Sequence, residues 1–162
     1  MCGSDCFTFS ACVHICEEML KVICGMSGSG KTTYVLRNKK DEDVILDLDY
    51  LKKCFNNQIK VSILKELQIK LISYFLSKNV DVWYITCFPS KEELASFPSD
   101  CEYLWVNTNY EKCSQNIRKR DIKSGKTAQD QLIDFNRKVL EKYKVSNIDF
   151  KILDIFDSGE RW

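Results

Sequence analysis

The stretch Lys21-Val-Ile-Cys-Gly25-Met-Ser-Gly-Ser-Gly30-Lys31-Thr32-Thr33 decides how the rest of the chain is interpreted. Lys21–Cys24 is a short run with the composition of a buried strand, and Lys31–Arg37 has the composition of a helix. The loop between them, Gly25–Gly30, contains three glycines, two serines and one methionine. A strand, a glycine-rich loop and a helix in direct succession predict the opening βα unit of an α/β sheet.

The loop has the spacing G-x-x-x-x-G-K-[ST], and each position has a chemical reason. Glycines let the backbone aim successive N–H groups at phosphate oxygens, and the helix that begins near Gly30 adds the positive end of its dipole. Lys31 can reach the β- and γ-phosphates, and the Thr32 hydroxyl can ligate Mg²⁺. We therefore predict that this P-loop binds a purine nucleoside triphosphate, ATP with Mg²⁺; a glycine-rich turn without a ligand is the alternative. The predicted cofactor-binding residues are Gly25, Met26, Ser27, Gly28, Ser29, Gly30, Lys31, Thr32 and Thr33.

Strand and helix patterns alternate along the remaining chain. The further predicted strands are Val44–Leu48, Val80–Cys87, Tyr103–Val106 and Phe150–Leu153. The predicted helices are Gln58–Ser77, a short one opened by a capping box at Ser90–Glu93, one opened by a capping box at Thr108–Glu111 and running toward Arg120, and Thr127–Tyr143. This alternation predicts parallel pairing and a three-layer α/β/α sandwich.

Composition sets the limits within which this fold must work. A length of 162 residues, with 44% hydrophobic and 29% charged residues, suits one globular domain, and the net charge of +1 indicates no particular partner. Apolar runs stay below the roughly 18 residues that span a bilayer, and no signal peptide is recognisable. Cysteines scattered singly through the chain favour a reducing, cytoplasmic compartment. We expect a domain over residues 19–155 and a polar tail over 156–162.

Residues 1–18 differ from the rest of the chain. They contain four cysteines and the one histidine, His14, but the cysteine spacing C-x₃-C-x₅-C-x₃-C matches no zinc pattern that we recognise. We interpret this segment as a cysteine-rich extension, either an extra helical turn or a disordered one. Alternatively the natural start is Met19, and residues 1–18 take no part in the fold.

Two carboxylates follow the second predicted strand, at the sheet edge where α/β proteins build their sites. Alternation along a strand would point Asp47 and Asp49 to the same face. Asp47 is a candidate Mg²⁺ ligand or partner of Lys31, and Asp49 a candidate catalytic base; its structural alternative is a helix N-cap. The third strand ends in Thr86 without any acid, which argues against a conventional hydrolysing ATPase.

Cationic residues gather in two segments. Arg118 and Arg120 precede a Gly-containing break and suggest a lid that closes over the phosphates, although a solvated basic helix end would look the same. Residues 50–80 carry six lysines and one acid, a local charge of about +5. Such a field favours a phosphorylated or polynucleotide acceptor, while lysines on an exposed helix face also serve solubility.

Together the segments Leu20–Thr33, Val44–Leu51, Val82–Pro89 and Leu104–Arg120 resemble the small phage-type P-loop kinases, often labelled AAA-domain ATPases. The well-understood relatives of that group are the 5′-hydroxyl polynucleotide kinases, and the resemblance covers most of residues 19–145. It implies a parallel five-stranded sheet in the order 2-3-1-4-5. The motif at Gly25–Thr32 is its specific part.

The same resemblance implies roles for single residues. Asp49 takes the place of the general base, Lys31 and Thr32 take the phosphate and magnesium roles, and Arg118 and Arg120 are the lid arginines. The chain departs from the polynucleotide kinases at Thr86, where they carry an acid. We therefore expect an ATP-dependent kinase acting on a nucleic-acid end, nucleoside or nucleotide. A P-loop ATPase acting on a partner and a non-catalytic nucleotide-binding module are the alternatives, and the sequence does not indicate an oligomeric state.

Overall fold

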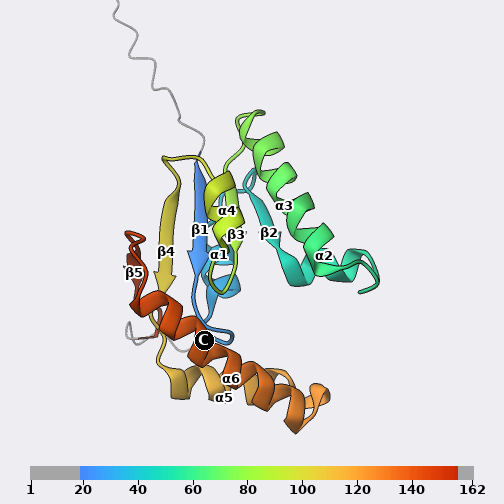
Figure 1. The fold of residues 1–162 in the computed structure, drawn as a ribbon, viewed down its shortest axis with the longest axis vertical. Coiled ribbons are helices and arrows are strands. Elements are labelled where there is room, and N and C mark those ends of the chain that lie inside the picture. Colours follow the sequence, from blue (N-terminus) through green and yellow to red (C-terminus); the bar gives the residue numbers. More distant parts are fainter. Residues whose placement is uncertain (1–18, 157–162) are drawn as a thin grey trace, which may run out of the picture.

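The computed structural model describes residues 19–156. The predicted cysteine-rich extension, and all of the predicted polar tail except Phe156, lie outside the described residues. Within them the elements alternate in the expected way (Figure 1). The strands are β1 (Leu20–Cys24), β2 (Val44–Asp47), β3 (Val82–Ile85), β4 (Glu102–Val106) and β5 (Lys151–Leu153). The helices are α1 (Lys31–Asn38), α2 (Leu48–Cys54), α3 (Val61–Leu76), α4 (Lys91–Ser96), α5 (Tyr110–Arg120) and α6 (Lys126–Lys144), with a 3₁₀ turn at Ile122–Ser124.

The five described strands form one parallel sheet in the order β2-β3-β1-β4-β5. This confirms the predicted order and places β1 in the centre, between β3 and β4. Because all strands run the same way, the segments that follow their carboxyl ends meet at one edge of the sheet. The P-loop after β1, the aspartates after β2 and Thr86 after β3 therefore lie at that edge.

Each face of the sheet carries its own apolar core. Alternate residues of β1 point to opposite faces, so that Val22 and Cys24 join one core and Ile23 the other. Helix α1 contributes the buried Val35 to the core that contains Ile23. The other face is covered by α3, which buries Ile72, and by α6, which buries Val139. Helices on both faces confirm the three-layer architecture.

The segment after β2 corrects the sequence prediction. The strand ends at Asp47, and α2 begins at Leu48 because the Asp47 carboxylate accepts a hydrogen bond from the Asp49 backbone N–H. Asp47 is therefore the N-cap and Asp49 lies in the first helical turn, so the expectation that both point from one strand face was wrong. The predicted long helix Gln58–Ser77 begins later, at Val61.

Two predicted capping boxes had different outcomes. The one at Ser90–Glu93 is present in both directions: the Ser90 hydroxyl accepts from the Glu93 N–H, and the Glu93 carboxylate accepts from the Ser90 N–H. The one at Thr108 was wrong, because Asn109 caps α5 by accepting a bond from the Lys112 N–H. Thr108 is buried and has another role, described below.

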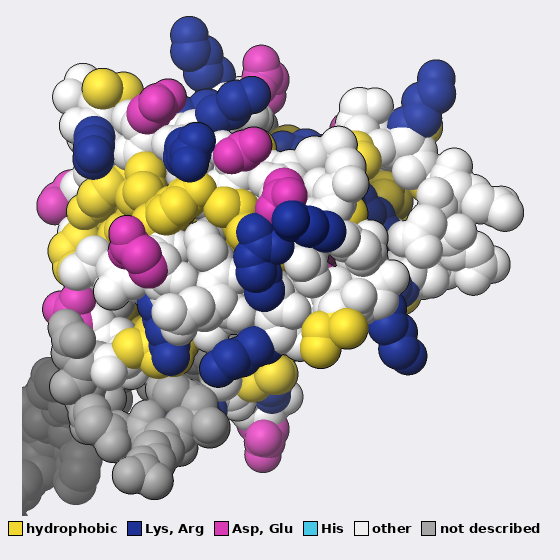
Figure 2. Space-filling view, turned by 90° about the horizontal axis from the view of Figure 1, so that it is seen from below, with side chains coloured by type: hydrophobic (Ala, Val, Ile, Leu, Met, Phe, Trp, Pro, Cys, Tyr) yellow, Lys and Arg dark blue, Asp and Glu magenta, His cyan; other side chains and the backbone are white. Residues whose placement is uncertain are grey.

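Helices α5 and α6 extend along the site edge of the sheet, below the carboxyl ends of β1 and β4 in Figure 1. Their side chains close one side of that edge. Seen from below, this face shows Lys and Arg side chains interspersed with Asp and Glu rather than one broad patch of a single sign (Figure 2). No helix in residues 19–156 is long and apolar enough to cross a membrane.

Candidate active site

The P-loop adopts a conformation that depends on its glycines. Gly28 and Gly30 have positive φ angles of 80° and 97°, which side-chain-bearing residues rarely adopt. A Cβ atom on Gly28 would also lie 2.6 Å from the carbonyl oxygen of Cys113 in α5, closer than real contacts allow. The loop is therefore closely packed against α5, and its shape requires glycine at this position.

Three polar side chains from distant parts of the chain hold the loop in place. The fully buried Asn136 of α6 accepts a bond from the Ser27 N–H at 2.8 Å and donates to the Ser27 carbonyl at 3.0 Å. Asn116 of α5 donates to the Gly28 carbonyl at 2.9 Å, and the Thr108 hydroxyl donates to the Ser29 carbonyl at 2.8 Å. Sequence reasoning assigned none of these three a place at the P-loop, because no motif marks a contact between residues so far apart.

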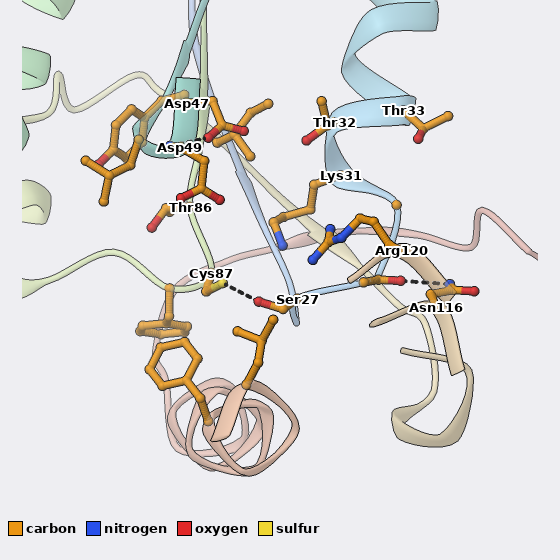
Figure 3. A pocket seen from close by; sticks show the side chains of 18 of the residues that line it. Ser27, Lys31, Thr32, Thr33, Asp47, Asp49, Thr86, Cys87, Asn116 and Arg120 are labelled. Atoms are coloured by element: carbon orange, nitrogen blue, oxygen red, sulfur yellow. Dashed lines mark hydrogen bonds between the residues drawn. The ribbon is translucent and has the colours of Figure 1, made fainter. Parts of the chain in front are cut away.

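The first turn of α1 presents the functional side chains predicted from the motif. The Lys31 ammonium donates to the Gly25 and Met26 carbonyl oxygens, both at 2.8 Å, and faces the middle of the cavity (Figure 3). Thr32 and Thr33 line the same cavity. Of the other predicted cofactor-binding residues, Ser27, Gly28 and Gly30 line it as well. Gly25, Met26 and Ser29 do not line it, and Met26 and Ser29 are buried.

These residues suit a bound triphosphate with magnesium. The loop supplies backbone N–H groups, α1 its positive end, Lys31 a cation and Thr32 a hydroxyl, which are the donors that phosphate oxygens and Mg²⁺ require. Asp47 and Asp49 line the same cavity and lie across it from Thr32 (Figure 3). No group of three or more His, Cys, Asp or Glu side chains that could hold a metal ion occurs in the described part of the chain.

Asp49 is the more available of the two carboxylates. Its side chain is 81% exposed, and its Oδ1 lies 3.6 Å from the Lys52 Nζ. The Asp47 carboxylate is engaged in capping α2 but also lines the cavity. Figure 3 shows both on the side of Lys31 opposite Arg120 and Asn116. A hydroxyl placed between Asp49 and Lys31 would thus meet a base on one side and a cation on the other.

The end of β3 brings a hydroxyl and a thiol to the cavity, not an acid. Thr86 and Cys87 both line it, and the Cys87 sulfur lies 3.6 Å from the Ser27 hydroxyl oxygen. The Gly25 N–H donates to the Cys87 carbonyl at 3.1 Å, which ties the P-loop to this segment. The carboxylates that line this cavity are those of Asp47 and Asp49, at the end of β2 and the start of α2.

The two predicted lid arginines lie in different environments. Arg120 lines the cavity, and Asp121 holds its guanidinium through two bonds of 3.0 and 3.1 Å, which also raises the Arg120 pKa. Arg118 does not line the cavity and instead pairs with Asp130 at 2.7 Å, joining α5 to α6. The structure thus brings Arg120 together with Lys31, Thr32 and Asp49, but not Arg118. Lys119 is a further cavity residue that the sequence prediction missed.

The cavity as a whole has a volume of about 800 Å³ and a positive balance of charge. Five cationic side chains line it, namely Lys31, Lys52, Lys65, Lys119 and Arg120, against the two aspartates Asp47 and Asp49. Apolar side chains from the segment after β3 and from α6, among them Phe88, Leu132 and Phe135, form another part of its wall. A cavity of this size lies within the range of small-molecule sites, and its charge suits an anionic ligand.

Several solved structures are similar to this chain in fold. A chain of the Pnkp1/Rnl/Hen1 RNA repair complex matches with a TM-score of 0.62 at 17% identity, over 83% of this chain and 47% of that one. A gluconokinase from Sinorhizobium meliloti 1021 matches with a TM-score of 0.54 at 13% identity, over 86% of this chain and 84% of that one. A shikimate kinase from Bacteroides thetaiotaomicron matches with a TM-score of 0.54 at 21% identity, over 84% and 85% of the two chains.

This chain has a P-loop kinase-like fold. It spans about half the length of the matching RNA repair chain and most of the length of the two small-molecule kinases. No family model and no curated protein matches the sequence. At these identities the likeness concerns the fold alone, so the chemistry of this P-loop kinase-like chain has to be argued from its own residues.

Proposed function

We propose that this chain is a small ATP-dependent kinase that transfers the γ-phosphate to a hydroxyl or phosphate group of a nucleic-acid end, nucleoside or nucleotide. The observation that carries the proposal is that one cavity contains Lys31 and Thr32 of the P-loop, Asp49 across from them and Arg120 beside them. Phosphoryl transfer needs positioning and charge stabilisation more than covalent chemistry, and these residues supply both.

Each residue has a definite task in this proposal. Residues Gly25–Thr33 hold the triphosphate of ATP, Thr32 and Asp47 hold Mg²⁺, and ATP supplies the phosphoryl group that is transferred. Asp49 accepts the proton that leaves the acceptor hydroxyl as its oxygen bonds to the γ-phosphorus, while the bond between that phosphorus and the β,γ-bridging oxygen breaks and ADP leaves. Lys31 and Arg120 stabilise the negative charge on the phosphoryl oxygens. We call Gly25–Thr33 the donor half of the cavity, and Asp49, Lys52, Lys65, Tyr84 and Thr86 the acceptor half.

Two findings support this proposal over its competitors. The RNA repair complex, gluconokinase and shikimate kinase are similar in fold, and the latter two names describe kinases of about this length. The absence of an acid at Thr86 favours a transferase over a conventional hydrolysing ATPase, although it also suits a non-catalytic nucleotide-binding module.

The cysteines of the described residues are all free, which supports a reducing, cytoplasmic location.

The proposal is tested by following the label of γ-labelled ATP. The protein is incubated with labelled ATP, Mg²⁺ and a panel of oligonucleotides, nucleosides and nucleotides, with a Lys31→Met protein purified in parallel to exclude contaminating kinases. The proposal requires label in an acceptor with wild type and not with the variant. Steady release of free phosphate without acceptor would instead identify an ATPase. Stabilisation by ATP and Mg²⁺ without any product would identify a binding module.

A further inference from the structure

A buried carboxylate lies behind the acceptor half of the cavity. The Glu93 side chain is 2% exposed, and its Oε1 accepts a 2.5 Å hydrogen bond from the Tyr84 hydroxyl. Its Oε2 accepts a 2.6 Å bond from the Ser90 N–H, as part of the capping box of α4. A buried carboxylate is costly unless it is hydrogen-bonded, and these bonds fix the position of Glu93.

Lys65 of α3 contacts this carboxylate and also lines the cavity. Its Nζ lies 3.3 Å from the Glu93 Oε1, while its side chain is 37% exposed and lines the cavity together with Tyr84. Burial, followed by the bond to Glu93, raises the pKa of Tyr84, so the tyrosine remains a neutral donor to Glu93. An ammonium group has three N–H donors. Of the contacts that the Glu93 carboxylate makes with the Tyr84 hydroxyl, the Ser90 N–H and the Lys65 ammonium, the one with Lys65 is the longest. The Lys65 ammonium is thus paired with Glu93 on one side and exposed to the cavity on the other.

The other lysines of residues 50–80 are placed differently. The Lys52 Nζ lies 3.6 Å from the proposed base, Asp49. Lys70 pairs with Glu66 on the exposed face of α3, and Lys53 and Lys78 lie over the rings of Tyr50 and Tyr74. Lys52 and Lys65 are the two of the six that line the cavity. Of the positive charge predicted for residues 50–80, only these two lysines therefore line the cavity. Lys52 lies beside Asp49, and Lys65 lies beside the buried Glu93.

We propose that Lys65 binds an anionic group of the acceptor, and that the acceptor is a hydroxyl compound carrying a phosphate or a carboxylate. The inference rests on the proposed function, since it concerns the acceptor of the same transfer. A cation whose position is fixed by a buried carboxylate, itself held by Tyr84 and the start of α4, loses little conformational entropy when an anion binds. Lys65 is a specificity-determining residue, and Glu93 is the residue that positions it.

The test compares neutral acceptors with anionic counterparts. Adenosine is compared with adenosine 3′-monophosphate, which keeps the same 5′-hydroxyl, and glucitol with gluconate, an open-chain compound of the same length in which one terminal CH₂OH is replaced by a carboxylate. Wild type is expected to use one charged member about tenfold or more better than its neutral partner, and the pair in which this occurs identifies the anion. Lys65→Met is expected to raise the acceptor KM for that charged compound about 10- to 100-fold, while kcat and the KM for ATP stay within about twofold.

Matched variants separate binding of the acceptor from support of the fold. Lys70→Met, on the exposed face of the same helix, is expected to behave as wild type, and Lys65→Arg to recover part of the discrimination. If Lys65→Met fails to fold, the double variant Glu93→Gln with Lys65→Met replaces it, because it removes both charges of the buried pair. This double variant is also expected to lose the discrimination between charged and neutral acceptors. Equal use of both members of each pair by wild type overturns the inference. So does a Lys65→Met protein that melts earlier yet discriminates as before. Absence of transfer to every acceptor instead refutes the proposed function, and the inference with it.

Discussion

The donor half and the acceptor half of the cavity are built in opposite ways. The donor half is one continuous segment, Gly25–Thr33, whose backbone conformation is fixed by its own glycines and by the packing of Gly28 on α5. The acceptor half takes single side chains from β2–α2, α3 and β3, which the parallel sheet brings to the same edge. Continuous sites leave a motif in the sequence, whereas assembled sites leave only scattered residues.

The largest effect is expected from the donor half. Lys31→Met removes the ammonium that faces the middle of the cavity, and transfer to every acceptor should fall about 10²- to 10³-fold. Stabilisation of the fold by ATP, measured as a shift in Tm, should shrink at the same time. If Lys31→Met weakened transfer to some acceptors and spared others, the division into two halves would be wrong.

The next prediction concerns what holds the donor half in place. Asn136→Ala leaves the Ser27 N–H and carbonyl without their partner, which should lower the free energy of unfolding by about 2–3 kcal/mol and weaken ATP binding. Urea unfolding and ATP titration measure the two effects. The control is Asn38→Ala, which removes an exposed bond to the Tyr34 carbonyl within α1 and should change stability by less than about 0.5 kcal/mol.

The two lid arginines allow a comparison within one helix. Arg120→Ala should lower kcat about 10- to 100-fold, because Arg120 lines the cavity beside Lys31. Arg118→Ala breaks a half-exposed ion pair with Asp130 and should reduce stability by at most about 1 kcal/mol, with transfer nearly unchanged. Equal losses of kcat in both variants would show that the helix moves as a lid and brings Arg118 to the phosphates as well.

The last prediction is a pH dependence of stability that leaves the protein unchanged at neutral pH and arises from Cys113, which contacts the donor half. Burial raises the pKa of the Cys113 thiol from 9.0 to about 12, and this residue packs against the P-loop at Gly28. The unfolded chain loses this proton near pH 9 while the folded chain keeps it, so the stability that the neutral thiol contributes is complete below pH 9 and is lost as pH rises toward 12. Cys113→Ala should reduce the alkaline slope of the unfolding free energy by up to about 1.4 kcal/mol per pH unit. Cys54→Ala, which removes an exposed thiol, is the control and should leave the slope as in wild type.

The contrast between the halves also explains what the sequence could predict. The P-loop with its flanking strand and helix agrees with the structure because local pattern and spacing determine it. The strand order agrees as well, but it was implied by the resemblance and not by any local pattern. The helix cap that the sequence offered as the structural alternative for Asp49 belongs instead to Asp47, since both aspartates are good capping residues and only the backbone decides between them.

The supporting contacts had no sequence signal at all. Thr108 was predicted to cap a helix but binds the Ser29 carbonyl, and Asn136 contacts Ser27 across 109 positions. Lys65 was one of six lysines in a basic segment, and the buried Glu93 behind it was known only as part of a capping box. Such contacts depend on how the helices pack, which a single sequence does not reveal.

Asp49 links the two halves of the cavity as the proposed base of the transfer. The decisive measurement compares Asp49→Asn with wild type in two assays, the rate of phosphate transfer and the affinity for ATP with Mg²⁺. We predict that transfer falls at least about 100-fold while ATP affinity changes less than about twofold, because the side chain serves the acceptor hydroxyl and not the triphosphate. A transfer rate that stays near that of wild type would contradict the proposed role of Asp49 as the base. A loss of ATP affinity as large as the loss of transfer would contradict it as well.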